Sequence, residues 1–150
     1  MSAGIGAIIR SLRIVVDTSV IVSALISETG ASREVIRRCF LGKDIPIIGD
    51  KLFCEFEDVL RRPQIKNRCP LTDKERDEFL NAFANVAELT DVFFLWRPNL
   101  PDEGDNHLIE LAVAGGAEAI ISLNTKDFKN AQLRFDFEVM TPSEFLKRSQ

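Results

Sequence analysis

The sequence predicts an α/β fold, a three-layer α/β/α sandwich with a central, mainly parallel sheet of about five strands. Short apolar segments without polar alternation, which is typical of strands buried on both faces, alternate along the chain with segments of helical spacing. No linker, internal repeat or low-complexity stretch interrupts this alternation. We therefore expect one domain over residues 10–150, preceded by an N-terminal extension of residues 1–9.

The first predicted strand covers residues 12–16, which are apolar and mostly β-branched. An apolar run over residues 20–26 then predicts the first helix. Asp17 or Thr18 can serve as its N-cap, because short polar side chains satisfy the first free N–H groups of a helix.

The next helix is expected over residues 32–41, which carry apolar side chains at helical spacing, and Gly42 should end it. Residues 45–50 predict a second short buried strand. A helix over residues 51–62 should end before Pro63, because the residue that precedes a proline disfavours the helical conformation.

A capping box formed by Thr72 and Glu75 predicts the start of a longer helix whose apolar stripe reaches Val86. Residues 92–96 suggest a short strand, and residues 98–106 have the composition of a loop.

The next predicted helix starts near His107 and ends at Gly115 and Gly116. Two further strands are expected, over residues 119–123 and just before Thr141. Thr141 should cap the last helix, with proline at its first position and a glutamate completing the capping box.

Composition limits the class of protein. No apolar run approaches the roughly 20 residues that a membrane span needs, and Arg10 interrupts the only stretch that resembles a signal peptide, so we expect a cytoplasmic protein. Cys39, Cys54 and Cys69 form no C-x-x-C pair, which argues against a disulfide framework or a zinc site and predicts buried thiols.

Charge is distributed unevenly, although the net charge is −4. Residues 1–70 contain 11 basic and 8 acidic residues, whereas residues 71–150 contain 8 basic and 15 acidic residues, so the first part of the chain is the one suited to phosphates. Solvated helix faces are an equally weighted explanation. The candidate phosphate-binding residues are Arg33, Arg37, Arg61 and Arg62.

Acidic residues follow the predicted strands where ligands bind in parallel sheets, at the carboxyl ends. Asp17 follows the first strand, and Asp127 lies just after the third apolar strand. Asp102 and Asp105 occupy the loop before the helix that starts near His107. Each acid alone can be explained as a helix cap or a solvated side chain. Together they predict that the acidic side chains lie at one edge of the sheet, where the strands end.

Glu55 falls within the apolar stripe of its helix, between Leu52 and Val59, where an unpaired charge is costly. Carboxylates about 5 Å apart repel by roughly 3 kcal/mol at an effective dielectric constant of 20, which favours protonation or a bound cation. Oxygen ligands select Mg²⁺ or Mn²⁺, and such an ion activates water for phosphodiester hydrolysis. His107, the only histidine, is expected on the helix surface without an acid–base network.

Four stretches in this order resemble the PIN-domain family, specifically the ribonuclease toxins of bacterial and archaeal toxin–antitoxin systems. They are "IVVDTSVIVSAL", "FCEFEDVLRRP", "LPDEGDNHLIELAVAGGAEAIISLNTKDF" and "VMTPSEFL". The resemblance implies the strand order 3-2-1-4-5, Mg²⁺- or Mn²⁺-dependent cleavage of single-stranded RNA or RNA loops, a homodimer, and a cognate antitoxin whose peptide enters the groove.

The resemblance also implies roles for individual residues. Asp17, Glu55 and Asp105 would be metal ligands, with Asp127 completing the acidic pocket, and Thr18, Ser122 and Asn124 would be supporting polar residues. Many relatives have an aspartate where this chain has Gly104, so the choice between Asp102 and Asp105 stays open, and one or two metals are possible.

Two other functions remain open. A phosphotransfer domain would also place an aspartate such as Asp17 after its first strand, but the second aspartate of such domains is replaced here by Ser19. A PIN-like binding module would keep the pocket without catalysis.

Overall fold

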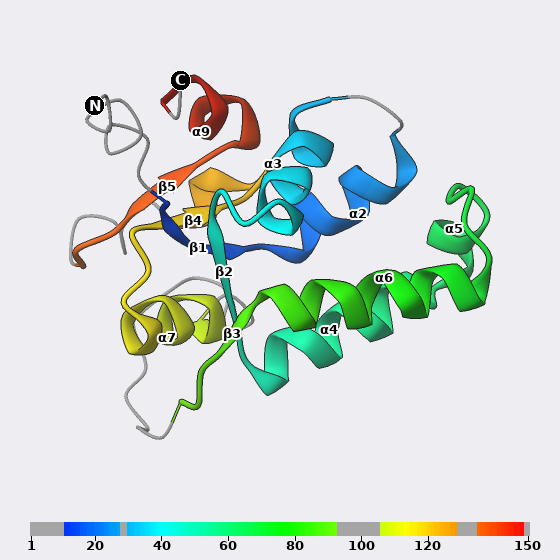
Figure 1. The fold of residues 1–150 in the computed structure, drawn as a ribbon, viewed down its shortest axis with the longest axis horizontal. Coiled ribbons are helices and arrows are strands. Elements are labelled where there is room, and N and C mark those ends of the chain that lie inside the picture. Colours follow the sequence, from blue (N-terminus) through cyan, green and yellow to red (C-terminus); the bar gives the residue numbers. More distant parts are fainter. Residues whose placement is uncertain (1–10, 28–29, 93–105, 129–134, 149–150) are drawn as a thin grey trace, which may run out of the picture.

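The computed structural model describes residues 11–27, 30–92, 106–128 and 135–148 of the chain. Within these residues a five-stranded sheet has the order β3-β2-β1-β4-β5, and every pair of neighbouring strands is parallel (Figure 1). The strands are β1 (Arg13–Val16), β2 (Ile45–Ile48), β3 (Glu88–Leu89), β4 (Ala119–Ile121) and β5 (Glu138–Met140). The predicted fold class and strand order are confirmed.

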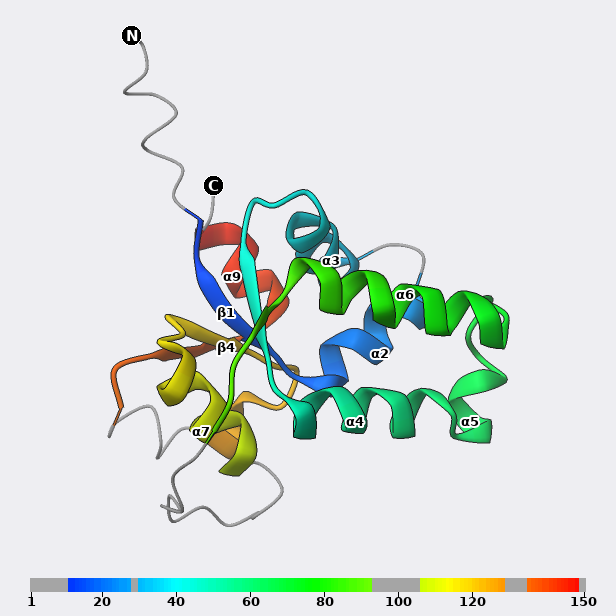
Figure 2. The ribbon, with the colours of Figure 1, turned by 60° about the horizontal axis from the view of Figure 1, so that its bottom comes forward.

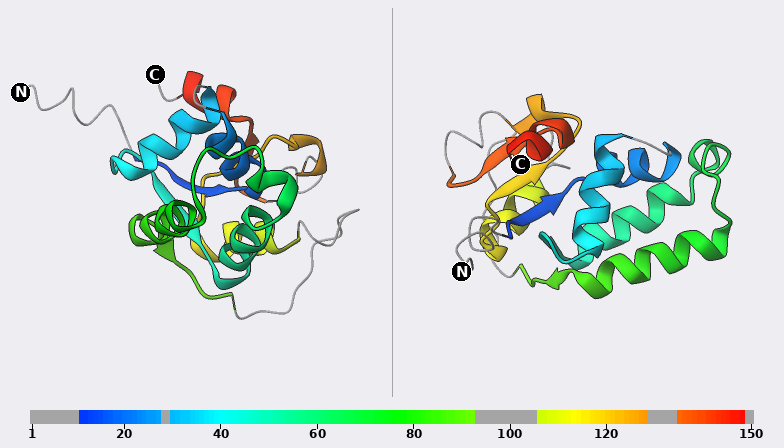
Figure 3. Two further views of the ribbon diagram at one scale, coloured as in Figure 1. Left: turned by 90° about the vertical axis from the view of Figure 1, so that its right-hand side faces the viewer. Right: turned by 45° about the horizontal axis from the view of Figure 1, so that its top comes forward.

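Helices cover both faces of the sheet, which makes three layers. Figure 1 shows α2 (Thr18–Ile26), α3 (Ala31–Phe40) and α9 (Pro142–Arg148) on one side, and α4 (Asp50–Leu60), α6 (Asp73–Val86) and α7 (Asn106–Gly115) on the other. In Figure 2, α4 leads away from the sheet and α6 returns to it, with α5 (Pro63–Lys66) at the far end. Figure 3 shows α9 beside α3, and a 3₁₀ helix, η2 (Thr125–Phe128), follows β4.

The core explains why the strands are uniformly apolar. Ile14, Val15, Ile120 and Ile121 have no exposed surface, because β1 and β4 lie inside the sheet with helices on both faces. The β1–β4 register pairs Val16 with Ile121, so the two strands end side by side. Their carboxyl ends therefore deliver the residues that follow them to one place. Among the described residues, no helix is long and apolar enough to cross a membrane.

Local signals identified the ends of several helices correctly. The Thr72 hydroxyl accepts from the N–H of Glu75 while the Glu75 carboxylate accepts from the N–H of Thr72, and Thr141 and Glu144 form the same reciprocal pair. Gly42 and Gly116, which follow α3 and α7, have φ angles of 75° and 66°, a region that favours glycine.

Two local predictions were wrong, and one strand was not predicted. Val92 is not in a strand, and the rest of the strand expected at residues 92–96 lies outside the described residues. The strand that was not predicted is β3, directly after α6. β3 is an exposed edge strand of only two residues, with Leu89 72% exposed, so it carries no buried apolar pattern. The helix expected over residues 51–62 ends at Leu60. Cys54 is exposed, whereas Cys39 and Cys69 are buried as expected.

A buried ion pair fixes the entrance to β1. The Asp44 carboxylate, with a fully buried side chain, accepts a hydrogen bond from Arg38 Nε at 2.7 Å and a longer one, 3.3 Å, from the backbone N–H of Leu12. The connection between α3 and β2 is thereby attached to the residue just before β1. Arg38 compensates a charge that would otherwise be buried without a partner.

We expect the Arg38→Met substitution to lower the free energy of unfolding by about 3 kcal/mol, because it leaves the Asp44 carboxylate buried and uncompensated. Arg37→Met is the matched control, since Arg37 pairs with Glu34 on the exposed surface, and it should cost at most about 1 kcal/mol. Urea denaturation measures both. Equal losses in the two variants would contradict a structural role for the buried pair.

Candidate functional site

Asp17 lies where β1 and β4 end. Its backbone N–H donates to the carbonyl of Ile121 at 2.9 Å, which extends the pairing of the strands by one residue. Asp17 is the N-cap residue of α2, but its side chain makes no capping hydrogen bond. Instead, Asp17 Oδ2 accepts from Ser122 Oγ at 2.7 Å and from Ser19 Oγ at 3.1 Å. Burial raises the pKa of Asp17, and the two serine hydroxyls oppose that rise.

The same serines connect α2 to the loop after β4. The backbone N–H of Asn124 donates to Ser122 Oγ at 2.9 Å, and that of Leu123 donates to Ser19 Oγ at 3.2 Å. Ser19 was not among the predicted site residues. Its only signal in the sequence was a hydroxyl in the first helical turn, two residues after the carboxylate that ends the strand.

Glu55 lies on α4 and is contacted from two other helices. Thr18 Oγ1, in the first turn of α2, donates to Glu55 Oε2. His107 Nε2, in the first turn of α7, lies 3.5 Å from Glu55 Oε1. The hydrogen bond from His107 lowers the pKa of Glu55, partial burial acts in the opposite direction, and Thr18 lowers it further. The Glu55 side chain remains 39% exposed.

His107 corrects a prediction. It was expected on the surface without an acid–base network, yet it is buried, with 8% exposure, and contacts Glu55. The sequence contained only a weak indication that His107 lies near the acidic residues. This lone histidine follows the acidic loop and starts the helix that packs on the sheet. Which side of the helix would be buried depended on the tertiary arrangement.

The predicted acids are brought together only in part. Asp17 and Glu55 are close enough that the negative charge of Glu55 helps to raise the pKa of Asp17. Asp127 lies in η2 with an exposed side chain, and its N–H donates to the carbonyl of Asn124 at 3.1 Å. It lines a cavity of about 310 Å³ formed by residues 123–127. Asp102 and Asp105 are outside the described residues.

Asp17 and Glu55 have the donor chemistry of a hard divalent cation. In the described ranges no three acidic, histidine or cysteine residues form a group able to hold a metal ion, so these two carboxylates are the partial set that the structure supplies. Their mutual repulsion would be relieved by a cation, and carboxylate oxygens suit Mg²⁺ or Mn²⁺. The residues present therefore fit such an ion, with further ligands required to complete its shell.

The predicted phosphate-binding arginines lie on two surfaces. On α4 and just beyond it, Arg62 pairs with Asp58 at 3.1 Å and its charge contributes to lowering the pKa of Glu55, whereas Arg61 lies 3.9 Å from Glu57.

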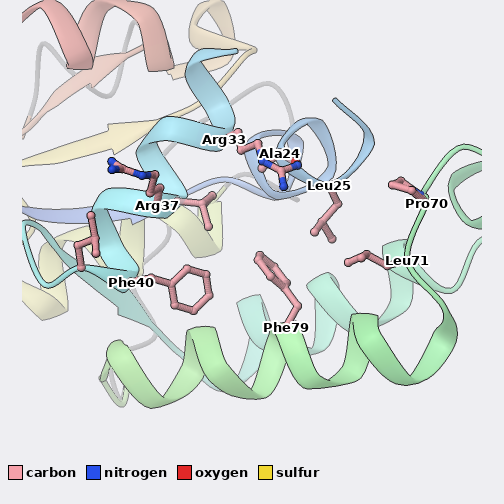
Figure 4. Close-up of a pocket in the computed structure, with 10 residues that line it drawn as sticks. Ala24, Leu25, Arg33, Arg37, Phe40, Pro70, Leu71 and Phe79 are labelled. Atoms are coloured by element: carbon pink, nitrogen blue, oxygen red, sulfur yellow. The ribbon is translucent and has the colours of Figure 1, made fainter. Parts of the chain in front are cut away.

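Arg33 and Arg37 instead lie on α3, beside an apolar pocket of about 720 Å³ (Figure 4). Phe40 of α3 and Phe79 of α6 meet across this pocket with ring centroids 5.7 Å apart. Ala24 also lines it, seven residues along α2 from Asp17, or about 10 Å along the helix axis. The pocket and the paired carboxylates are therefore separate features of the surface.

A comparison with protein-family models matches residues 13–126 to the PIN domain. Comparisons with curated proteins and with solved structures gave no match. PIN domains are nuclease-type domains that commonly use divalent metals and typically bind RNA. The match includes Asp17, Glu55, His107 and Ser122, which are among the polar residues described above.

We expect Asp17→Asn to stabilise the metal-free protein increasingly as the pH rises. Because burial raises the pKa of Asp17, the folded state holds this proton more tightly than the unfolded chain. The contribution to folding is therefore fully present below about pH 4, the ordinary aspartate pKa, and is lost as the pH rises through the folded-state pKa.

Melting temperatures are measured with a chelator between about pH 3 and pH 8. The melting temperature of Asp17→Asn should rise relative to that of the parent as the pH approaches neutral. Asp77→Asn, which removes an exposed charge on α6, is the comparison. The same pH course in both variants would contradict the effect of burial.

Proposed function

Because this chain belongs to the PIN domain family, we propose that it is a Mg²⁺- or Mn²⁺-dependent endoribonuclease that hydrolyses RNA phosphodiester bonds, and the toxin of a toxin–antitoxin pair. The observation that supports this most is that two carboxylates from separate elements lie close together, Asp17 at the end of β1 and Glu55 on α4. Thr18, the residue after Asp17, donates its hydroxyl to Glu55. A buried acid beside a second acid is costly unless the site has a use for the charge.

Asp17 and Glu55 would hold the cation, with Asp105 or Asp102 as a third ligand and Asp127 completing the acidic pocket. When bound, the ion lowers the pKa of a water molecule and stabilises charge on the phosphate. Ser122 and Ser19 hold the direction of the Asp17 carboxylate, and Asn124 orients Ser122 through its backbone N–H. Cleavage then needs no nucleophilic side chain.

RNA would be held by arginines that contact phosphates. Arg62 lies seven residues after Glu55, just beyond the C-terminal end of α4. Because its charge contributes to lowering the pKa of Glu55, we expect Arg62 to contact a phosphate near the one being cleaved. Arg61, Arg33 and Arg37 complete the proposed set of RNA contacts.

The proposed functional unit is one domain over residues 10–150 that works as a cytoplasmic homodimer. A cognate antitoxin protein would neutralise it by placing a peptide in the groove.

Asp17→Asn and Glu55→Gln should each slow RNA cleavage at a fixed Mg²⁺ concentration by at least about 100-fold, because each removes a charged ligand while keeping the size of the side chain. Cleavage of a fluorescent single-stranded RNA measures the rate, and circular dichroism checks the fold. Asp77→Asn is the control and should cleave at the parental rate. Cleavage by Asp17→Asn as fast as by the parent would overturn the assignment.

Arg62→Gln should weaken RNA binding and reduce the slope of log affinity against log salt by about 0.7, the value for one phosphate contact on a single strand. Binding is measured by fluorescence anisotropy with Asp17→Asn as the background, so that RNA is not cut. Lys147→Gln, on α9, is the matched control and should leave the slope unchanged. An unchanged slope in Arg62→Gln would rule out its contact with phosphate.

A further inference from the structure

Three helices meet at the Glu55 carboxylate. Thr18 comes from the first turn of α2, Glu55 from the second turn of α4 and His107 from the first turn of α7. The two partners contact different oxygens of Glu55. Thr18 Oγ1 donates to Oε2, and His107 Nε2 lies 3.5 Å from Oε1. These two contacts, one on each oxygen, favour a single position and plane for the carboxylate.

This arrangement leaves room for a cation. Each carboxylate oxygen has two lone-pair directions, so one donor per oxygen leaves one direction on each for a metal ion. The Glu55 side chain is 39% exposed, whereas His107 is only 8% exposed, so the histidine contacts the carboxylate from the protein side. The open side of Glu55 faces solvent.

His107 is held more firmly than Glu55. The residues that follow it, Leu108 and Ile109, are 1% and 0% exposed, and α7 packs on β1, β2 and β4. A half-exposed glutamate without fixed donors samples several rotamers, and binding a cation would restrict it. A donor on a packed helix already restricts the side chain in the metal-free protein, so that cation binding loses less conformational entropy.

We propose that His107 is a positioning residue that donates from Nε2 to Glu55 Oε1 and thereby sets this carboxylate for a divalent cation shared with Asp17. The inference rests on the proposed metal-dependent function. It adds a role for a residue that lies outside the predicted set of acidic ligands. Groups that orient metal ligands in this way typically change metal affinity by 10- to 100-fold when they are removed.

The test compares His107→Gln with His107→Met. The two side chains have similar length, but only glutamine offers an N–H at the position of Nε2. We expect Met to weaken Mn²⁺ binding by roughly 10-fold or more and Gln by less than about threefold, measured by calorimetric titration of the metal-free protein. Val113→Ala, an exposed change on the same helix, should bind Mn²⁺ like the parent.

The outcomes separate the inference from the proposed function. Parental Mn²⁺ binding by both His107 variants overturns the positioning role and leaves the metal site intact. Equal weakening in Gln and Met also overturns it, because the N–H would then be irrelevant. No Mn²⁺ binding by the parent overturns both proposals.

A second measurement needs no substitution of His107. It is the only histidine in the chain, so its ring nitrogens give one unambiguous set of NMR signals. We expect the Nε2–H tautomer in the parent, and we expect Mg²⁺ to shift its signals in the parent but not in Asp17→Asn. The Nδ1–H tautomer would overturn the proposal, because Nε2 could not then donate to Glu55.

Discussion

The parallel pairing of β1 with β4 is the constraint on which the site depends. It brings the ends of two buried strands together, so that the N–H of Asp17 reaches the carbonyl of Ile121 and Ser122 Oγ reaches the Asp17 carboxylate. A carboxylate in this position is costly, and burial raises its pKa. The serine hydroxyls compensate only part of that cost, which is typical of residues kept for binding or chemistry.

The second acid, Glu55, is positioned by different contacts. Glu55 is half-exposed on α4, and its pKa is lowered, chiefly by the hydrogen bond from His107. Thr18 connects the two acids, since it follows Asp17 in the chain and donates to Glu55. The Asp17 carboxylate is therefore held at a strand end by two serine hydroxyls, and the Glu55 carboxylate is contacted from two neighbouring helices. Two negative charges thereby lie close enough to interact.

Local patterns predicted most of the fold, and tertiary contacts explain what they missed. The apolar runs of β1 and β4 and the capping boxes at Thr72 and Thr141 are encoded within a few residues, and they were correct. β3 was not predicted because a two-residue edge strand is defined by its neighbour β2 and not by its own sequence. His107 was missed because its partner, Glu55, lies 52 positions away in sequence, and Ser19 was missed in part because it also accepts from the N–H of Leu123, 104 positions away.

The central claim is that Asp17 and Glu55 share one divalent cation. The most direct test is a crystal structure of the parent protein grown with Mn²⁺, in which anomalous scattering locates the ion. The account predicts one peak with an oxygen of each carboxylate at roughly 2.1 Å, the distance of a small hard cation. A Mn²⁺ peak bound elsewhere, or none between these two side chains at saturating metal, would contradict it.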